Sequence, residues 1–162
     1  VIRKPASYDG RVIYEAELGV VVGRECVNLS AADAVGAIFG YTCVNDVTAL
    51  QILNEDESFV QWARAKGFDT FGPIGPVIAS GVDVSSANIR AELNGRERQN
   101  YPVSDLFIGP AELVGRISRC MTLYPGDIIS CGTGPGALPM KPGATIEVII
   151  DGIGTLSNTY EA

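Results

Sequence analysis

The segment from residue 12 to residue 23, VIYEAELGVVVG, constrains the fold of this chain more than any other segment. Its β-branched run at residues 20–22 predicts a strand that enters a hydrophobic core. Glu15 and Glu17 stand two residues apart just before that run. Side chains two apart on a strand point to the same face of the sheet. The pattern therefore predicts two neighbouring carboxylates, which either face water or share a divalent cation.

Alternating apolar residues and turn signals predict further strands. Residues 88–103 have the pattern of a hairpin with Asn94-Gly95 at its turn, and residues 144–160 have the pattern of a second with Asp151-Gly152. Other strands are expected in residues 40–44, in the second half of residues 68–80 and in residues 127–133. Because strands dominate, we expect a single α+β domain over residues 1–162, built mainly on β-sheet.

Three short helices are expected between these strands. Ser30 followed by Asp33 resembles a capping box and predicts a helix over residues 32–39. A second helix is expected over residues 54–66, ending before a glycine. A third begins at Pro110, since proline suits the first turn of a helix. Its apolar face would consist of Leu113, Val114, Ile117 and Met121.

The charge of the chain narrows the classes of partner. The net charge of −7 argues against unspecific binding to nucleic acid or to anionic membranes. No apolar run reaches the length of a membrane span, and no signal-peptide pattern opens the chain. We therefore expect a cytoplasmic protein with no membrane partner, and the start at Val1 suggests a missing upstream segment.

The cysteine and histidine content limits the available chemistry. The four cysteines form no CxxC pair, and we expect all of them to be buried thiols in a reducing compartment, with two disulfides as the less favoured alternative. They are Cys26, Cys43, Cys120 and Cys131. Their spacing and the lack of histidine disfavour a zinc site. Any chemistry must therefore use carboxylates, lysine, hydroxyls or a metal.

Three further positions could support such chemistry. Asp46 follows an apolar strand and either caps a turn or supplies a third carboxylate ligand. Lys66 either complements the dipole of the helix that it ends or points at an anionic intermediate. The loop CGTGPGALP at residues 131–139 is either a tight connection or a nest of backbone N–H groups that, with the Thr133 hydroxyl, binds a carboxylate.

Six segments in a fixed order resemble a known family. They read YEAELGVVVGR, GYTCVNDVTA, QWARAKGFDTFGPIGP, LNGRERQ, MTLYPGDIISCGTG and KPGATIEVIIDGIGTLSN. Together they resemble the C-terminal catalytic domain of the fumarylacetoacetate hydrolase family over nearly the whole chain. The resemblance implies a β-roll of mixed sheets with short peripheral helices and assembly into a homodimer.

The resemblance also implies a metal site. Glu15 and Glu17 match the acids of the family's ExE motif, and Asp46 matches the aspartate of its NDV motif. In the family these three residues bind a divalent cation, usually Mg²⁺ and sometimes Mn²⁺ or Ca²⁺. Lys66 matches the active-site lysine, so the resemblance implies a catalytic role for it.

The same resemblance implies a substrate site. Thr70 matches a threonine near the active-site lysine, and Gly132 and Thr133 match the family's GT motif. In the family that motif's threonine contacts the carboxylate of the substrate. We therefore expect Thr70, Gly132 and Thr133 to bind a small oxo acid, and Thr133 to act with Lys66 in catalysis.

The implied reaction is hydrolysis of a C–C bond in a small 2-oxo acid or 1,3-diketone, of acylpyruvate or fumarylacetoacetate type, through an enolate stabilised by the metal. One alternative is a lyase or isomerase of the family: oxaloacetate decarboxylase, 2-hydroxyhepta-2,4-diene-1,7-dioate isomerase or 2-oxo-3-deoxy sugar acid dehydratase. It needs no attacking water, which agrees with the lack of histidine. A non-catalytic metal-binding relative is the other alternative, because Leu50 and Leu53 replace the family's arginine and glutamine.

Overall fold

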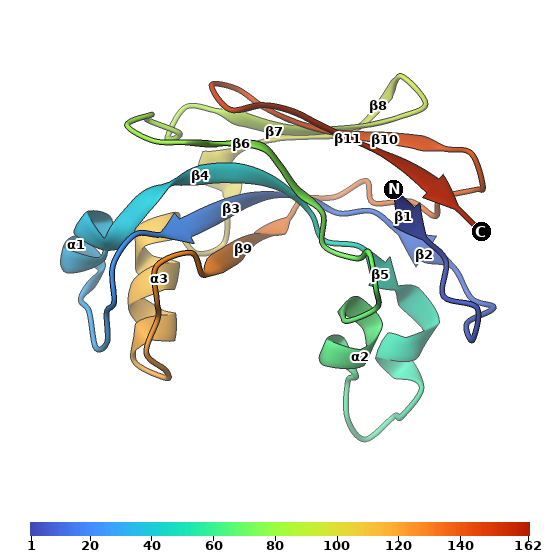
Figure 1. Cartoon of the computed structure of the whole chain (residues 1–162), viewed down its shortest axis with the longest axis horizontal. Coiled ribbons are helices and arrows are strands. Elements are labelled where there is room, and N and C mark those ends of the chain that lie inside the picture. The colour runs from blue at the N-terminus through green and yellow to red at the C-terminus, as the bar shows by residue number, and fades with distance from the viewer.

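Two layered β-sheets form the body of the molecule, and the computed structural model describes all residues from 1 to 162 (Figure 1). The five-stranded sheet has the order β1 (Ile2–Arg3), β11 (Gly154–Glu161), β10 (Thr145–Ile150), β7 (Asn88–Leu93) and β8 (Arg96–Pro102). The four-stranded sheet has the order β6 (Ile74–Ala79), β4 (Ile38–Asn45), β3 (Ala16–Val22) and β9 (Ile128–Thr133). Strands β2 (Val12–Ile13) and β5 (Thr48–Ala49) form a separate pair.

Neighbouring strands are antiparallel except β1 and β11, which run parallel with Ile2 opposite Tyr160. This parallel pairing brings the two ends of the chain to the same side of the molecule (Figure 1). The mixed, mainly β architecture with few short helices confirms the predicted fold class.

The helices are short, and the α-helices lie toward the two ends of the four-stranded sheet, two at one end and one at the other (Figure 1). The α-helices are α1 (Ala31–Ala34), α2 (Trp62–Lys66) and α3 (Pro110–Ser118), and the 3₁₀-helices are η1 (Val35–Ala37), η2 (Leu50–Asn54) and η3 (Val103–Asp105). Helices α1 and α3 contact each other, and α2 contacts η2. No helix has both the length and the apolar character needed to cross a membrane.

Strand β3 is buried along its whole length, as the apolar run at residues 20–22 predicts. Its first half, with Leu18, belongs to a cluster of 26 buried residues that includes Ile89 and Ile146 of the five-stranded sheet. Its second half, with Val20, belongs to a cluster of eight buried residues that includes Val114 of α3. Any polar side chain on β3 is therefore withdrawn from water.

Both predicted hairpins are confirmed. Asn94 and Gly95 connect β7 to β8 with φ of 53° and 70°, the left-handed values that a two-residue Asn-Gly turn requires. Gly152, with φ of 80°, lies in the turn between β10 and β11. The Ser30 cap of α1 and the start of α3 at Pro110 are also confirmed.

The helix predicted over residues 54–66 is wrong in its first half. Only Trp62–Lys66 is α-helical, and residues 50–54 form the 3₁₀-helix η2. Between them the side chain of Asp56 accepts the N–H of Ser58 at 2.9 Å, a local turn that competes with helical hydrogen bonding. The helix predicted over residues 32–39 is likewise shortened, because residue 38 already belongs to β4.

Two predictions of burial are also wrong. Cys120 is exposed and Cys131 is half-buried, whereas Cys26 and Cys43 are buried free thiols as expected. Met121 lies beyond the end of α3 and is 59% exposed, so it does not extend the buried face of that helix.

Candidate metal centre

Three carboxylates converge where β3 begins and β4 ends. Glu15 precedes β3, Glu17 lies within it, and Asp46 follows β4. The two strands are antiparallel with Ala16 opposite Asn45, so these ends lie side by side. The Asp46 N–H donates to the Glu15 carbonyl at 2.9 Å and fixes the two segments together. One oxygen of each carboxylate lies within 4.8 Å of the other two.

Lys66, the last residue of α2, directs its ammonium group into this cluster. Its Nζ lies 2.8 Å from Glu15 Oε2, 2.5 Å from Asp46 Oδ2 and 2.9 Å from Thr48 Oγ1. Burial alone would lower the pKa of Lys66, but hydrogen bonds to Asp46 and Glu15 outweigh burial and raise that pKa above its ordinary value. Lys66 is therefore a positive charge at neutral pH, directed at anionic groups.

Glu17 is the most buried of the three acids, with 3% of its surface exposed. Its Oε2 accepts the N–H of Gly132 at 2.7 Å, but Lys66 forms its ion pairs with the other two acids. Burial, followed by the charge of Asp46, raises the pKa of Glu17 from its ordinary 4.5 to about 7. A buried carboxylate without a counter-ion costs free energy, so this position favours a second cation.

The donor set fits a hard divalent cation. When all three carboxylates are ionised, they supply three negative charges against the one positive charge of Lys66, which leaves a balance of −2. Carboxylate oxygens are the ligands that Mg²⁺, Ca²⁺ and Mn²⁺ prefer. The chain folds so that Glu15, Glu17 and Asp46 could hold such an ion together.

The glycine-rich loop begins at the end of β9, beside Glu17. The N–H of Gly132 donates to the chain's own Glu17, so the binding of a substrate carboxylate by a nest of N–H groups in this loop stays a prediction. A side chain at Gly134 would collide with the ring of Tyr101 on β8, so glycine lets the loop lie flat against the other sheet. Thr133 is thereby held next to the metal centre, and its hydroxyl donates to the Ala16 carbonyl at 2.9 Å.

The family model described as fumarylacetoacetate (FAA) hydrolase C-terminal matches residues 1–161. The chain belongs to the fumarylacetoacetate hydrolase family. The resemblance carried by the six sequence segments is therefore confirmed over the whole chain.

Three solved structures are similar to this family member over 99% of its length. A 5-carboxymethyl-2-hydroxymuconate delta-isomerase from Mycobacterium smegmatis is 43% identical with a TM-score of 0.93. A 2-hydroxyhepta-2,4-diene-1,7-dioate isomerase from Mycobacterium marinum is 44% identical with a TM-score of 0.93. A fumarylpyruvate hydrolase from Pseudomonas aeruginosa, solved with Mn²⁺ and pyruvate, is 30% identical with a TM-score of 0.92. The chain spans 62%, 62% and 70% of the lengths of these three proteins.

Thr70, which the family resemblance places near the active-site lysine, makes no hydrogen bond to the metal centre. Its hydroxyl accepts the N–H of Arg3 at 2.8 Å, and its φ of 70° is unusual for a β-branched residue. Thr70 lines a surface cavity with Arg3 and Lys4 that includes none of the three acids. Its assignment to substrate binding therefore remains a prediction.

Two polar residues near the carboxylate cluster, Thr48 and Gln99, were not predicted from the sequence. Thr48 lies in β5 and completes the set of oxygens around Lys66. It stands two residues after Asp46, a spacing that could have suggested a shared face. Gln99, on β8 of the other sheet, binds Ala16 and Thr133 beside the carboxylate cluster, and no spacing in the sequence indicates those contacts.

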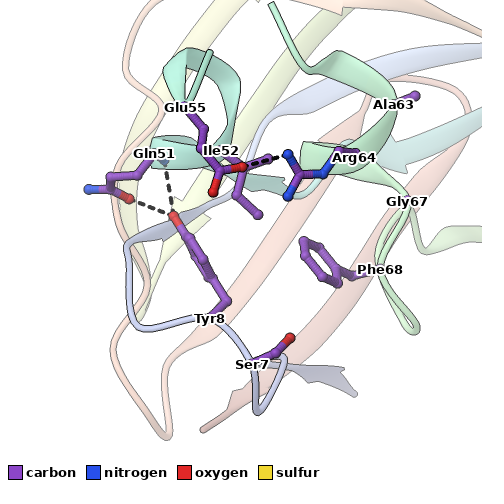
Figure 2. Close-up of a pocket in the computed structure, with 9 residues that line it drawn as sticks. All are labelled: Ser7, Tyr8, Gln51, Ile52, Glu55, Ala63, Arg64, Gly67 and Phe68. Atoms are coloured by element: carbon purple, nitrogen blue, oxygen red, sulfur yellow. Dashed lines mark hydrogen bonds and ion pairs between the residues drawn. The ribbon is translucent and has the colours of Figure 1, made fainter.

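A cavity of about 530 Å³ lies on another side of α2, and Figure 2 shows its lining. Arg64 of α2 pairs with Glu55 across it at 2.5 Å, and the Tyr8 hydroxyl bonds to the Gln51 side chain. None of the three acids lines this cavity, and neither does Lys66. Helix α2 therefore presents Lys66 to the metal centre and Arg64 to a separate surface cavity.

Proposed function

We propose that this chain is the catalytic domain of a divalent-metal-dependent enzyme that isomerises a small 2-oxo acid or its enol. The observation that supports the proposal is the cluster of Glu15, Glu17 and Asp46 with Lys66 inserted between two of its acids. Isomerisation is favoured over hydrolysis because the two isomerases are 43% and 44% identical to the chain, whereas the hydrolase is 30% identical. This replaces hydrolysis, the first expectation from the sequence.

In this proposal Glu15, Glu17 and Asp46 hold Mg²⁺ or Mn²⁺, with Ca²⁺ as a further candidate. When bound, a divalent cation stabilises negative charge that develops on the oxygens of an oxo acid. Gly132 and Thr133 lie at the Glu17 side of the cluster, where the Gly132 N–H holds Glu17 and the Thr133 hydroxyl would bind the carboxylate of the substrate. The substrate would thus lie between the acids and the glycine-rich loop.

Lys66 holds its proton at Nζ, because its pKa is raised by the two acids that it contacts. Migration of a double bond requires a proton to leave one atom of the substrate and another to be returned elsewhere. Lys66 would donate its Nζ proton to the substrate atom that gains hydrogen, and the neutral amine that results would take the proton that leaves the other atom, so the ammonium is restored. Lys66 is therefore the residue to which we assign proton donation.

Hydrolysis of a C–C bond is the second candidate, favoured by the Mn²⁺ and pyruvate complex of the Pseudomonas aeruginosa hydrolase. The same cluster would serve both reactions, and the difference lies in whether a water molecule attacks the substrate. The products separate the two candidates. An isomerase converts 2-hydroxyhepta-2,4-diene-1,7-dioate to a product of equal mass, whereas a hydrolase releases pyruvate from an acylpyruvate.

The first test is isothermal titration with Mg²⁺ and Mn²⁺. Wild type should bind one ion per chain, and Glu17→Gln should bind it at least tenfold more weakly because a charged ligand is lost. Glu25→Gln, which neutralises an exposed acid outside the cluster, should bind like wild type. A folded wild type that binds neither ion would contradict the proposal.

The second test separates binding from turnover through Lys66→Met. This variant should bind Mn²⁺ at least as tightly as wild type, because a positive charge leaves the cluster, and should lose at least about a hundredfold in turnover. Lys141→Met, at an exposed lysine, should keep both the Mn²⁺ affinity and the turnover of wild type. Full turnover by Lys66→Met would remove lysine from the mechanism. Homodimer formation, expected from the family, remains a prediction that sedimentation equilibrium would test.

A further inference from the structure

Gln99 joins the two sheets next to the carboxylate cluster. It belongs to β8 of the five-stranded sheet and is 1% exposed. Its Oε1 accepts the N–H of Ala16, the residue between the two acids of the ExE pair, at 3.0 Å. Its Nε2 donates to Thr133 Oγ1 at 2.9 Å and to the Gly134 carbonyl at 2.8 Å. One buried amide therefore contacts both β3 and the glycine-rich loop.

These partners fix which end of the Gln99 amide faces Thr133. The Ala16 N–H can only donate, so it requires the amide oxygen, and the Gly134 carbonyl can only accept, so it requires the amide nitrogen. A reversed amide would create two unfavourable contacts in a buried site. The nitrogen of Gln99 is therefore the group that faces the Thr133 hydroxyl.

This orientation restricts the proton of Thr133. A hydroxyl has one proton and two lone pairs, and the amide nitrogen of Gln99 has only protons to offer. Gln99 therefore occupies a lone pair of Thr133 Oγ1, and the Thr133 proton must point elsewhere. In the structure it points at the Ala16 carbonyl, 2.9 Å away.

The Ala16 carbonyl does not depend on that proton. It also accepts the hydroxyl of Tyr101 at 2.6 Å, so it keeps a hydrogen-bond partner when Thr133 turns its proton away. Thr133 and Tyr101 line a cavity of about 490 Å³ together with Asp105, Leu106 and Gly132. None of the three acids lines this cavity, which adjoins the acid cluster through Gly132, whose N–H binds Glu17. The Thr133 proton can therefore turn toward a ligand in this cavity without leaving a buried carbonyl unpaired.

We infer that Gln99 is a positioning residue, which makes Thr133 a hydrogen-bond donor to the carboxylate of an acidic ligand beside the metal centre. Gln99 does this by occupying the threonine's lone pair, while Tyr101 satisfies the carbonyl that would otherwise compete for the proton. The inference rests on the proposed function, because the ligand is the carboxylate end of the 2-oxo acid.

The test uses oxalate as the probe, since its adjacent carboxylates resemble the oxygen pattern of a 2-oxo acid. Oxalate affinity is measured by isothermal titration at saturating Mn²⁺ for wild type, Gln99→Glu, Thr133→Val and the double variant. Each single variant should bind oxalate roughly tenfold more weakly, the loss of one hydrogen bond to a charged group. The double variant should bind no more weakly than Thr133→Val, because Gln99 acts through the threonine hydroxyl.

Gln99→Glu is chosen because it keeps the size of the side chain and the oxygen that accepts the Ala16 N–H. It replaces the amide nitrogen with an oxygen that can accept the Thr133 proton, so the proton is drawn away from the ligand. Because this oxygen also faces the Gly134 carbonyl and adds a charge, the double variant is made with the neutral Gln99→Met, which is also measured as a single variant. Asn100→Asp is the matched control, since it makes the same chemical change at the next, exposed residue of β8. It should bind oxalate like wild type.

The outcomes are distinguishable. Equal oxalate affinity in wild type and Gln99→Glu, or additive losses in the double variant, would overturn the inference and leave the proposed function intact. A parallel loss of Mn²⁺ affinity in Gln99→Glu would also overturn it, because Gln99 would then act on the metal ligands. A wild type that binds Mn²⁺ but not oxalate would overturn both proposals. If Gln99→Glu does not fold, the single variant Gln99→Met takes its place.

Discussion

The two halves of the candidate metal centre are held in place by different means. Glu17 projects from β3, which has a hydrogen-bonded strand on each side and is buried along its length. Lys66 projects from α2, a helix of five residues that follows an irregular segment. Isolated helices shorter than about 12 residues are marginal in water, so α2 depends on its tertiary contacts.

Those tertiary contacts are few. The N-cap residue of α2, Gln61, makes no side-chain capping hydrogen bond, and Ala65 is the helix's one fully buried residue. Much of the anchoring of α2 therefore comes from Lys66 itself, through its three hydrogen bonds to the acids and Thr48. The carboxylate half of the site is held in place by the sheets. The position of Lys66 instead depends partly on its own hydrogen bonds to the carboxylates and Thr48.

The largest expected effect compares the same substitution in the two halves. Leu18→Ala, in the fully buried part of β3, should lower the free energy of unfolding by about 2–5 kcal/mol. Leu50→Ala, in η2, which contacts α2, removes a leucine that is only partly buried and should cost about 1 kcal/mol. Urea titration of both variants measures the difference, and equal losses would mean that the two halves are equally well anchored.

The second prediction concerns Glu17 in metal-free protein. Its pKa is about 7 in the folded state and near 4.5 in the unfolded chain, so the folded state binds more protons between these values. The unfolding free energy should therefore fall as pH rises from about 4.5 to 7. Glu17→Gln does not titrate, so at pH 8 it should be more stable than wild type by about 3 kcal/mol, with no difference at pH 4.

Glu15→Gln is the matched variant from the lysine side of the cluster, and it should change stability in the opposite direction. Glu15 pairs with Lys66 at 2.8 Å, and removal of that charge should destabilise the metal-free protein at pH 8 by roughly 1–3 kcal/mol. Chemical denaturation of both variants and wild type, in the presence of a metal chelator at pH 4 and pH 8, measures these differences in unfolding free energy. Destabilisation by Glu17→Gln at pH 8 would show that this acid already has a cation partner within the chain.

The elements that the sequence predicts well are those whose signals are local. The Asn94-Gly95 turn, the Ser30 cap and the buried run of β3 each depend on residues within a few positions of one another. The convergence of Glu15 and Glu17 with Asp46 required the strand pairing, which family resemblance anticipates but periodicity alone does not.

Sequence analysis missed one feature that is set by a tertiary contact and one that is set by local side-chain bonding. Gln99 contacts Ala16, 83 positions away, across two sheets, and nothing near it in the sequence marks that role. The helix predicted over residues 54–66 failed because local side-chain bonding at Asp56 and Ser58 competes with helical hydrogen bonds. The short helix that remains still ends at Lys66 and directs it at Glu15 and Asp46, and its predicted role toward an anionic intermediate stays a prediction.

The smallest expected effect uses Trp62, the chain's one tryptophan, as a probe of the lysine half. Its ring lies 5.5 Å from Lys66 Nζ at the start of α2. If α2 detaches before the sheets unfold, the fluorescence of Trp62 should change at a urea concentration about 0.5 M below the midpoint measured by circular dichroism.

Lys66→Met should widen this gap by lowering the fluorescence midpoint alone, since it removes the anchor of α2 but no contact between the sheets. Coincident transitions in both proteins would mean that α2 unfolds together with the sheets, and the contrast between a fixed and a site-anchored half would then be wrong.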